Sequence, residues 1–179
     1  MCLDFHPKYP ALLAVGCYDG TVMVYDIRIK GNNKPIYQST VRTNKHTDPV
    51  WQVKWAPLDP AKALSFYSIS SDGRVANWNL MKNKLEPEEV IKLKLVVDNE
   101  KELSENKKEA FLYGLAGGMC FDFNKFNESL FLVGTEEGKI HLCSKAYSGQ
   151  YLETYEGHYL AVYAVKWNAF HPRVFLSCS

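Results

Sequence analysis

The chain has 179 residues, a net charge of +1, and 46% apolar and 23% charged residues, the composition of an ordinary globular protein with a sizeable core. The near-zero charge gives no electrostatic reason to expect nucleic acid or an acidic membrane surface as a partner. No apolar run approaches the roughly 18 residues that span a bilayer. Neither nucleic acid nor a membrane is therefore among the expected partners.

The cysteines are dispersed and odd in number, and no two of them form a C-x-x-C pair or lie at zinc spacing with a histidine. We expect buried, reduced thiols in a reducing intracellular compartment. Residues 1–5 do not resemble a signal peptide. The cysteines are Cys2, Cys17, Cys120, Cys143 and Cys178.

The first unit, predicted at residues 1–41, consists of short apolar runs separated by turn signals. Runs at 11–16 and 21–26 flank an Asp-Gly pair at 19–20. Because Asp-Gly between two alternating apolar runs is a strong hairpin signal, the pattern predicts two paired strands here. A further, outer strand is expected at 36–41.

The second unit, predicted at 46–97, has the clearest pattern. It begins with KHTDPVWQVKW at 45–55 and continues with LSFYSISSDGRVANWNL at 64–80. Alternating Val, Trp, Phe and Tyr surround an Asp-Gly turn at 72–73, which indicates short half-buried strands. An outer strand is expected at 90–95.

Residues 98–110, DNEKELSENKKEA, contain one large apolar side chain, Leu103, and many charges of both signs. Such a segment cannot bury enough apolar surface to pack as a core element. We expect a charged surface insertion, and the alternative is a loop that a partner orders.

The third and fourth units repeat the pattern less perfectly. The third is predicted at 117–155, with a Glu-Gly turn at 137–138 and an outer strand at 151–155. The fourth is predicted at 158–179, after a Gly-His pair at 157–158, and it contains two strand-like runs. It is incomplete as a four-strand unit.

The units share one register. The anchors of their first strands are Phe5, Trp55, Phe123 and Trp167, which are 50, 68 and 44 residues apart, and the long interval contains the charged insertion. Units of about this length with a Gly-His start and a Trp near the end are typical of WD blades. The chain is therefore predicted to be all-β, a partial WD40-type β-propeller of about three blades plus the start of a fourth. Because a blade needs neighbours on both faces, we expect a segment of a longer propeller.

The second unit contains His46, Ser70, Asp72 and Trp78, and in WD repeats that it resembles such residues form a hydrogen-bonded network inside the blade. A Ser/His/Asp trio also invites interpretation as a catalytic triad. The chain has no G-x-S-x-G elbow, no H-E-x-x-H and no phosphate-binding glycine loop before a helix. The structural interpretation is therefore preferred, no catalytic, cofactor-binding or metal-binding residue is assigned, and no enzyme is expected.

Longer motifs narrow the prediction beyond a WD repeat. HTDPVWQVKW at 46–55 resembles the H-x-D-P-V-W-x-V-x-W stretch of dynein intermediate chains, and LVGTEEGKI at 132–140 is similar to their V-G-T-E-E-G-x-I run. Residues 66–78 and 90–93 also resemble this family. With VGCYDG at 15–20, the pattern is most similar to its axonemal outer-arm members. The resemblance covers nearly the whole chain apart from the charged insertion.

The resemblance implies a non-catalytic motor subunit of the cytoskeleton. In that family the propeller binds the tail of a dynein heavy chain, and an N-terminal extension recruits dynein light chains and a second intermediate chain. The assembly docks on the doublet microtubules of the axoneme in cilia and flagella, and the heavy chain hydrolyses ATP. Three alternatives stay open: a cytoplasmic dynein intermediate chain that acts as a cargo adaptor, a generic WD scaffold such as a ubiquitin-ligase substrate receptor, and a propeller enzyme with a ligand in its channel.

Propellers usually bind partners through the loops at one face and through blade edges. Trp51 has an alternative role in packing between blades, and Asp48 has an alternative role in shaping the turn before Pro49. By register, the candidate partner contacts are Tyr18, Asp48, Trp51, Ser71, Glu136 and Tyr159.

Overall fold

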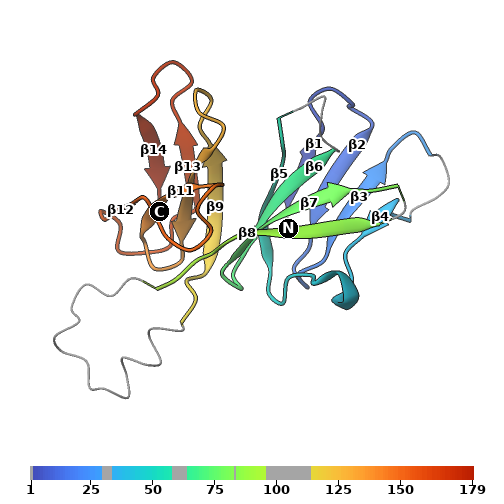
Figure 1. Ribbon diagram of the computed structural model, residues 1–179, viewed down its shortest axis with the longest axis horizontal. Coiled ribbons are helices and arrows are strands. Elements are labelled where there is room, and N and C mark those ends of the chain that lie inside the picture. Colours follow the sequence, from blue (N-terminus) through green and yellow to red (C-terminus); the bar gives the residue numbers. More distant parts are fainter. Residues whose placement is uncertain (1, 30–33, 58–63, 83, 96–113) are drawn as a thin grey trace.

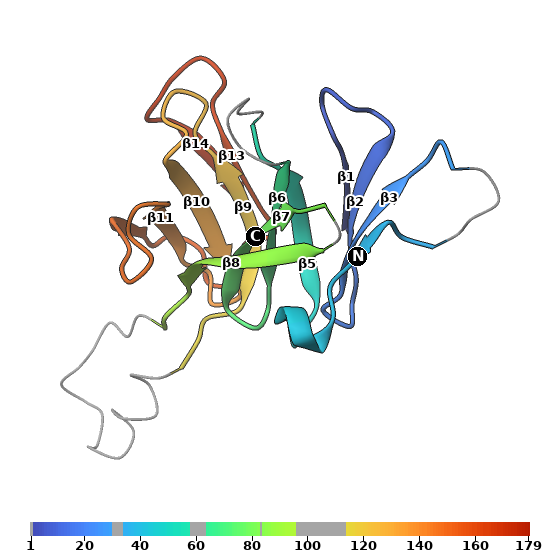
Figure 2. The same ribbon diagram turned by 45° about the vertical axis from the view of Figure 1, so that its right-hand side comes forward.

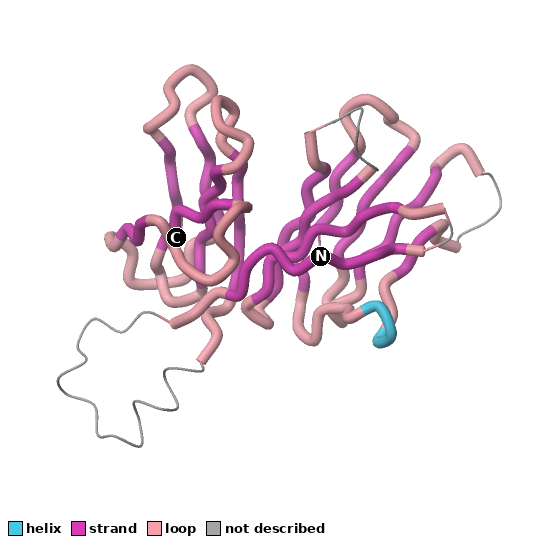
Figure 3. Tube along the Cα trace, in the orientation of Figure 1, coloured by secondary structure: helices cyan, strands magenta, loops and turns pink. Residues whose placement is uncertain are grey.

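A computed structural model of the chain describes residues 2–29, 34–57, 64–82, 84–95 and 114–179, and strands dominate it (Figures 1 and 3). Across this described part, no helix has the length and apolar composition needed to cross a bilayer. One 3-10 helix, η1 (Val41–Thr43), precedes β5. The strands are β1 (Cys2–Phe5), β2 (Leu12–Gly16), β3 (Val22–Asp26), β4 (Tyr37–Gln38), β5 (Val50–Trp55), β6 (Ser65–Ser70), β7 (Arg74–Leu80), β8 (Leu85–Lys92), β9 (Gly118–Phe123), β10 (Leu130–Thr135), β11 (Ile140–Ser144), β12 (Glu153–Tyr155), β13 (Ala164–Trp167) and β14 (Phe175–Cys178).

These strands form antiparallel sheets in which neighbours along the chain are also neighbours in space. The first sheet is β1–β4, the second β5–β8 and the third β9–β12, each in chain order, and β13 pairs with β14 in a fourth, two-stranded sheet. Consecutive sheets lie next to one another, with a face of each sheet turned toward a face of the next (Figure 2). This is the arrangement of propeller blades, and it confirms the predicted all-β, partial WD-type propeller.

Glycines at three equivalent turns explain why the Asp-Gly and Glu-Gly pairs recur. Gly20, Gly73 and Gly138 have φ angles of 80°, 76° and 85°, which favour glycine. A Cβ on Gly20 would also lie 2.1 Å from the carbonyl oxygen of His46, and one on Gly138 would lie 2.6 Å from that of His158. Each turn therefore packs against the segment that leads into the next sheet.

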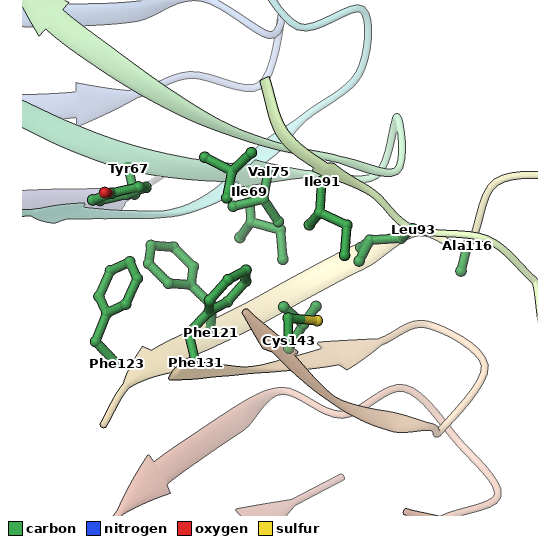
Figure 4. Packing of buried hydrophobic residues seen from close by; sticks show 12 residues of the cluster. Tyr67, Ile69, Val75, Ile91, Leu93, Ala116, Phe121, Phe123, Phe131 and Cys143 are labelled. Carbon is green, nitrogen blue, oxygen red and sulfur yellow. The ribbon is translucent and has the colours of Figure 1, made fainter. Parts of the chain in front are cut away.

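Apolar clusters fill the spaces between neighbouring sheets, and they follow from the alternation in the strands. In β6, Phe66 packs toward the first sheet while Tyr67 and Ile69 pack toward the third. Each large side chain buried in this way contributes about 1.5–3 kcal/mol. The cluster between the second and third sheets is drawn in Figure 4 and consists of Tyr67, Ile69, Val75, Val90, Ile91, Leu93, Ala116, Phe121, Phe123, Phe131, Val133 and Cys143.

Polar contacts also join the first strands of neighbouring sheets. Oδ2 of Asp4 in β1 accepts a hydrogen bond from the backbone N–H of Trp55 in β5 at 2.9 Å. Oδ2 of Asp122 in β9 accepts one from the backbone N–H of Trp167 in β13, also at 2.9 Å, and its other oxygen pairs with Lys54 of β5. Neither aspartate was predicted to make such a contact.

Two outer strands, β4 and β8, differ from their predicted ranges, whereas β12 lies within the predicted 151–155. Instead of a strand over 36–41, β4 covers Tyr37–Gln38, because the chain then turns into η1, where the backbone N–H of Thr40 donates to Oγ1 of Thr43 at 2.8 Å. β8 begins at Leu85, five residues before the predicted start. It includes Pro87, which an edge strand tolerates because its outer side makes no ladder hydrogen bonds. The predicted charged insertion at 98–110 lies outside the described residues.

Candidate functional site

Four side chains form a hydrogen-bonded network across the second sheet. Nδ1 of His46, in the segment before β5, is 2.9 Å from Oδ2 of Asp72 in the β6–β7 turn. Its Nε2 is 2.7 Å from Oγ of Ser68 in β6, and Nε1 of Trp78 in β7 donates to the same hydroxyl at 2.7 Å. Because a carboxylate only accepts hydrogen bonds, Nδ1 of His46 carries a proton and donates a hydrogen bond to Asp72.

The serine of this network is Ser68, which corrects the predicted Ser70. Oγ of Ser70 instead donates to the carbonyl oxygen of Asp48 at 2.9 Å and accepts from the backbone N–H of Asp72 at 3.2 Å. Both serines lie on the same face of β6, so alternation alone cannot separate them. The strand register does so, because the pairing of β6 with β7 ends at Ile69, before Ser70.

Asp72 is the charged centre of the network. Besides His46, its carboxylate accepts from the backbone N–H of Thr47 at 3.1 Å and from the backbone and guanidinium of Arg74 at 2.8–3.0 Å. Burial by itself would raise the pKa of Asp72, but the hydrogen bonds and charges of His46 and Arg74 outweigh it and hold the pKa well below its usual range. The carboxylate is therefore ionised and fully hydrogen-bonded.

The order Ser68–His46–Asp72 matches a catalytic triad in connectivity, but its burial does not suit catalysis. The exposed fraction of Ser68 is 0% and that of His46 is 1%, and the serine hydroxyl also binds the indole of Trp78. A nucleophile must be reachable by its substrate. The arrangement is suited to joining the segment before β5 to two strands and a turn.

Among the described residues, no group of three or more His, Cys, Asp or Glu side chains could hold a metal ion.

The predicted partner contacts all lie at one end of the sheets, which we call the turn end. It carries the β2–β3, β6–β7 and β10–β11 turns and the segments that lead into β5, β9 and β13, because in an antiparallel meander these loops meet at the same end. Three of the predicted residues are connected there. Nε1 of Trp51 donates to Oγ of Ser71 at 2.6 Å, and Ser71 donates to Oε1 of Glu136 in the third sheet.

The other three predicted contacts are not part of that connection. The exposed fraction of Tyr18 is 70% and that of Tyr159 is 99%. Asp48 is exposed and accepts a hydrogen bond from Oγ1 of Thr47 at 3.0 Å. Tyr18 and Tyr159 thus present aromatic surface to solvent at the turn end, whereas Trp51 is partly engaged between two sheets.

Two buried or half-buried histidines were not assigned these contacts from the sequence. Nε2 of His158 is 2.8 Å from Oγ of Ser177, a contact equivalent to that between His46 and Ser68. The Gly-His sequence at 157–158, typical of the start of a WD blade, could have indicated this contact. His141 in β11 stacks on Tyr151, with ring centroids 3.8 Å apart and an interplanar angle of 6°. Burial, followed by the charge of Lys139, lowers the pKa of His141 to about 4.

Comparisons with known proteins agree with this architecture and indicate to which proteins the chain is similar. The model of the family described as WD domain, G-beta repeat, matches residues 1–26. The chain is 56% identical over 181 residues to the "Dynein, 78 kDa intermediate chain, flagellar outer arm" of Chlamydomonas reinhardtii, an alignment that takes in 100% of this chain and 26% of that relative.

Two further relatives are the "Dynein intermediate chain 2, ciliary" of Heliocidaris crassispina and the "Dynein axonemal intermediate chain 1" of Rattus norvegicus. They are 51% and 50% identical over 179 residues, which is 100% of this chain and 25% of each relative. The chain thus spans about a quarter of the length of the curated relatives that it matches. Their names agree with the predicted axonemal, ciliary or flagellar setting. Over its whole length the chain is therefore similar to a segment of axonemal, ciliary and flagellar dynein intermediate chains.

Proposed function

We propose that this chain is part of a non-catalytic intermediate chain of axonemal outer-arm dynein, which helps to assemble the motor and to dock it on the doublet microtubules of cilia and flagella. The observation that carries the proposal is identity of 50–56% over the whole chain to relatives named for flagellar, ciliary and axonemal dynein. The sheet arrangement supports it, because a rigid propeller is well suited to hold protein partners on its loops.

The non-catalytic role is supported by the burial of the one Ser–His–Asp arrangement found among the described residues. Ser68 and His46 are inaccessible, and every donor and acceptor in their network is engaged within the second sheet. In the proposed assembly the heavy chain hydrolyses ATP.

We place the contact with the tail of the heavy chain at the turn end. Exposed aromatic side chains such as Tyr18 and Tyr159 offer large, rigid contact surfaces, and residues of this type often dominate binding energy at interfaces. Asp48 and Glu136 supply acceptors around them. Light chains and a second intermediate chain are further proposed partners, and their contacts are proposed for other parts of the longer protein.

Localisation separates this proposal from a cytoplasmic dynein adaptor. The full-length protein, tagged and expressed at its native level in a ciliated cell, is expected to fractionate with isolated axonemes and to leave them with the outer arms on salt extraction. Recovery in the cytosol alone, with cargo vesicles or with ubiquitin-ligase components, would overturn the proposal. A tagged tubulin serves as the control, because it stays with the axoneme after the salt wash.

A further inference from the structure

A groove of about 660 Å³ opens between the second and third sheets, at the end opposite the turn end. It begins where the apolar cluster between these sheets stops, and Figure 4 shows Tyr67 and Phe123 at that edge of the cluster. In β7 the residues on this side change from the buried Val75 to Asn77 and Asn79, which line the groove. Its volume is within the range of pockets that hold ligands.

One acceptor in this groove lacks a donor. Oδ1 of Asn77 is buried and has no hydrogen-bond partner, although Nδ2 of the same amide donates to Oε2 of Glu88 at 3.2 Å. Buried polar atoms are nearly always satisfied, and an exception calls for an explanation. An occupant that brings an N–H group would satisfy this oxygen and would lie next to the carboxylate of Glu88.

The charge of the lining favours a cation. Glu88, Glu89 and Glu128 contribute three carboxylates to the lining, and Lys145 contributes one ammonium. Glu89 is also paired with Lys92, whose Nζ lies 3.5 Å from its Oε1, which leaves more carboxylates than ammonium groups. The ammonium of Lys145 lies over the aromatic rings of Tyr67 and Phe123, 5.1 and 4.4 Å from their centroids. These cation–π contacts hold it against the aromatic side of the groove. The groove therefore carries excess negative charge, which would repel a phosphate or another carboxylate.

The mouth of the groove favours a peptide over a free small cation. Pro57 and Met81 line it and are exposed, Met81 by 38%. Apolar surface beside a polar pocket is covered when residues that flank the bound side chain pack on it.

We propose that this groove binds an arginine side chain carried on an extended segment of a partner protein. A guanidinium has five N–H donors in a planar fork, so it can donate to Oδ1 of Asn77 and to the carboxylate of Glu88 together. A lysine offers a compact charge without that fork. The proposal does not depend on heavy-chain binding, because that contact is placed at the turn end.

The test uses the full-length protein and a small probe, acetyl-Gly-Arg-Gly-amide, in saturation-transfer difference NMR. The matched peptide with citrulline in place of arginine has nearly the same shape and no charge. The arginine peptide is expected to bind saturably and at least about tenfold more tightly than the citrulline peptide, since a hydrogen bond to a charged group is worth roughly that factor. Equal binding of both peptides, or binding of neither, would overturn the proposal.

Two variants locate the site. Glu88→Gln is expected to weaken binding of the arginine peptide about tenfold. Glu86→Gln, on the same strand, removes a carboxylate that pairs with Lys84 and does not line the groove, and it is expected to leave binding within twofold of the unchanged protein. If both variants weaken binding equally, the peptide responds to general surface charge and the assignment of the groove is wrong.

Discussion

At the scale of single residues, the network in the second sheet depends on which hydroxyl completes it. The sequence identified His46, Asp72 and Trp78 correctly as the residues to examine, because their types and spacing match a WD blade. The predicted serine, Ser70, was wrong: Ser68 faces the same side of β6, and the register with β7 distinguishes the two. Residue type and spacing thus predict a network, and strand pairing decides its members.

Replacement of these serines should therefore have unequal effects. Ser68→Ala leaves Nε1 of Trp78 and Nε2 of His46 buried without a partner, and we expect a loss of about 2–4 kcal/mol in the free energy of unfolding. Ser70 is equally buried, but it contacts only turn backbone atoms of Asp72 and of the exposed Asp48, so Ser70→Ala should cost about 1 kcal/mol. Urea denaturation of the full-length protein, followed by tryptophan fluorescence, measures both. An equal or larger loss with Ser70→Ala would contradict the assignment.

The buried ring of His141 predicts a pH dependence. Its pKa in the folded protein is about 4, below the usual 6.5, so the unfolded chain binds the extra proton more readily. The neutral ring therefore contributes stability above about pH 6.5, and this contribution is lost as the pH falls toward 4. His141→Phe keeps a ring against Tyr151 and should flatten the fall in stability between pH 6.5 and 4.

At pH 7 the same variant should be less stable than the unchanged protein, because the contact of 2.9 Å between His141 and Oγ1 of Thr154 is lost. The control is His171→Phe, at an exposed turn position, which should keep the slope of the unchanged protein. Urea midpoints measured at several pH values test the prediction, and parallel profiles for His141→Phe and the unchanged protein would contradict it.

At the scale of elements, the inner strands and the outer strand β12 were predictable, whereas the bounds of the outer strands β4 and β8 were not. β2, β3, β6 and β7 have strong alternation and flank glycine turns, so their places follow from the sequence. β4 and β8 lie at sheet edges, where only one neighbouring strand constrains them. The end of β4 is set by the contact between Thr40 and Thr43. Contacts such as that between Asp4 and Trp55 join residues of different units, and no local sequence pattern predicts them.

Close approach of the second and third sheets makes Gly118 at the start of β9 intolerant of a side chain. An added Cβ would lie 2.5 Å from Cγ1 of Ile69, which is fully buried and cannot move away. Gly118→Ala should therefore destabilise the protein by about 1–3 kcal/mol through overpacking. Gly149→Ala is the matched control, because no atom lies within 4 Å of its added Cβ. Thermal or urea unfolding compares the two, and equal stabilities would show that the sheets can separate without cost.

At the scale of the whole molecule, the propeller carries two proposed binding surfaces, the turn end and the groove opposite it. The propeller itself was predictable, because four units in one register leave few other folds. The groove opposite the turn end was not, because it arises where two sheets diverge, and its residues come from separate strands and turns.

Tyr159 tests the partner surface with little effect on the fold. Its exposed fraction is 99%, so Tyr159→Ala should leave the unfolding midpoint unchanged and reduce capture of heavy chain severalfold. Tyr147→Ala, also exposed but beyond the other end of the third sheet, is the matched control and should capture heavy chain as the unchanged protein does. Equal capture by both variants would exclude Tyr159 from the contact.

The most direct measurement of the central proposal is affinity capture of the tagged full-length protein from a salt extract of axonemes, with the captured proteins identified by mass spectrometry. Membership of outer-arm dynein predicts that a dynein heavy chain is recovered in near-stoichiometric amount, together with a second intermediate chain and light chains. Recovery of the tagged protein without any axonemal heavy chain would contradict the proposal.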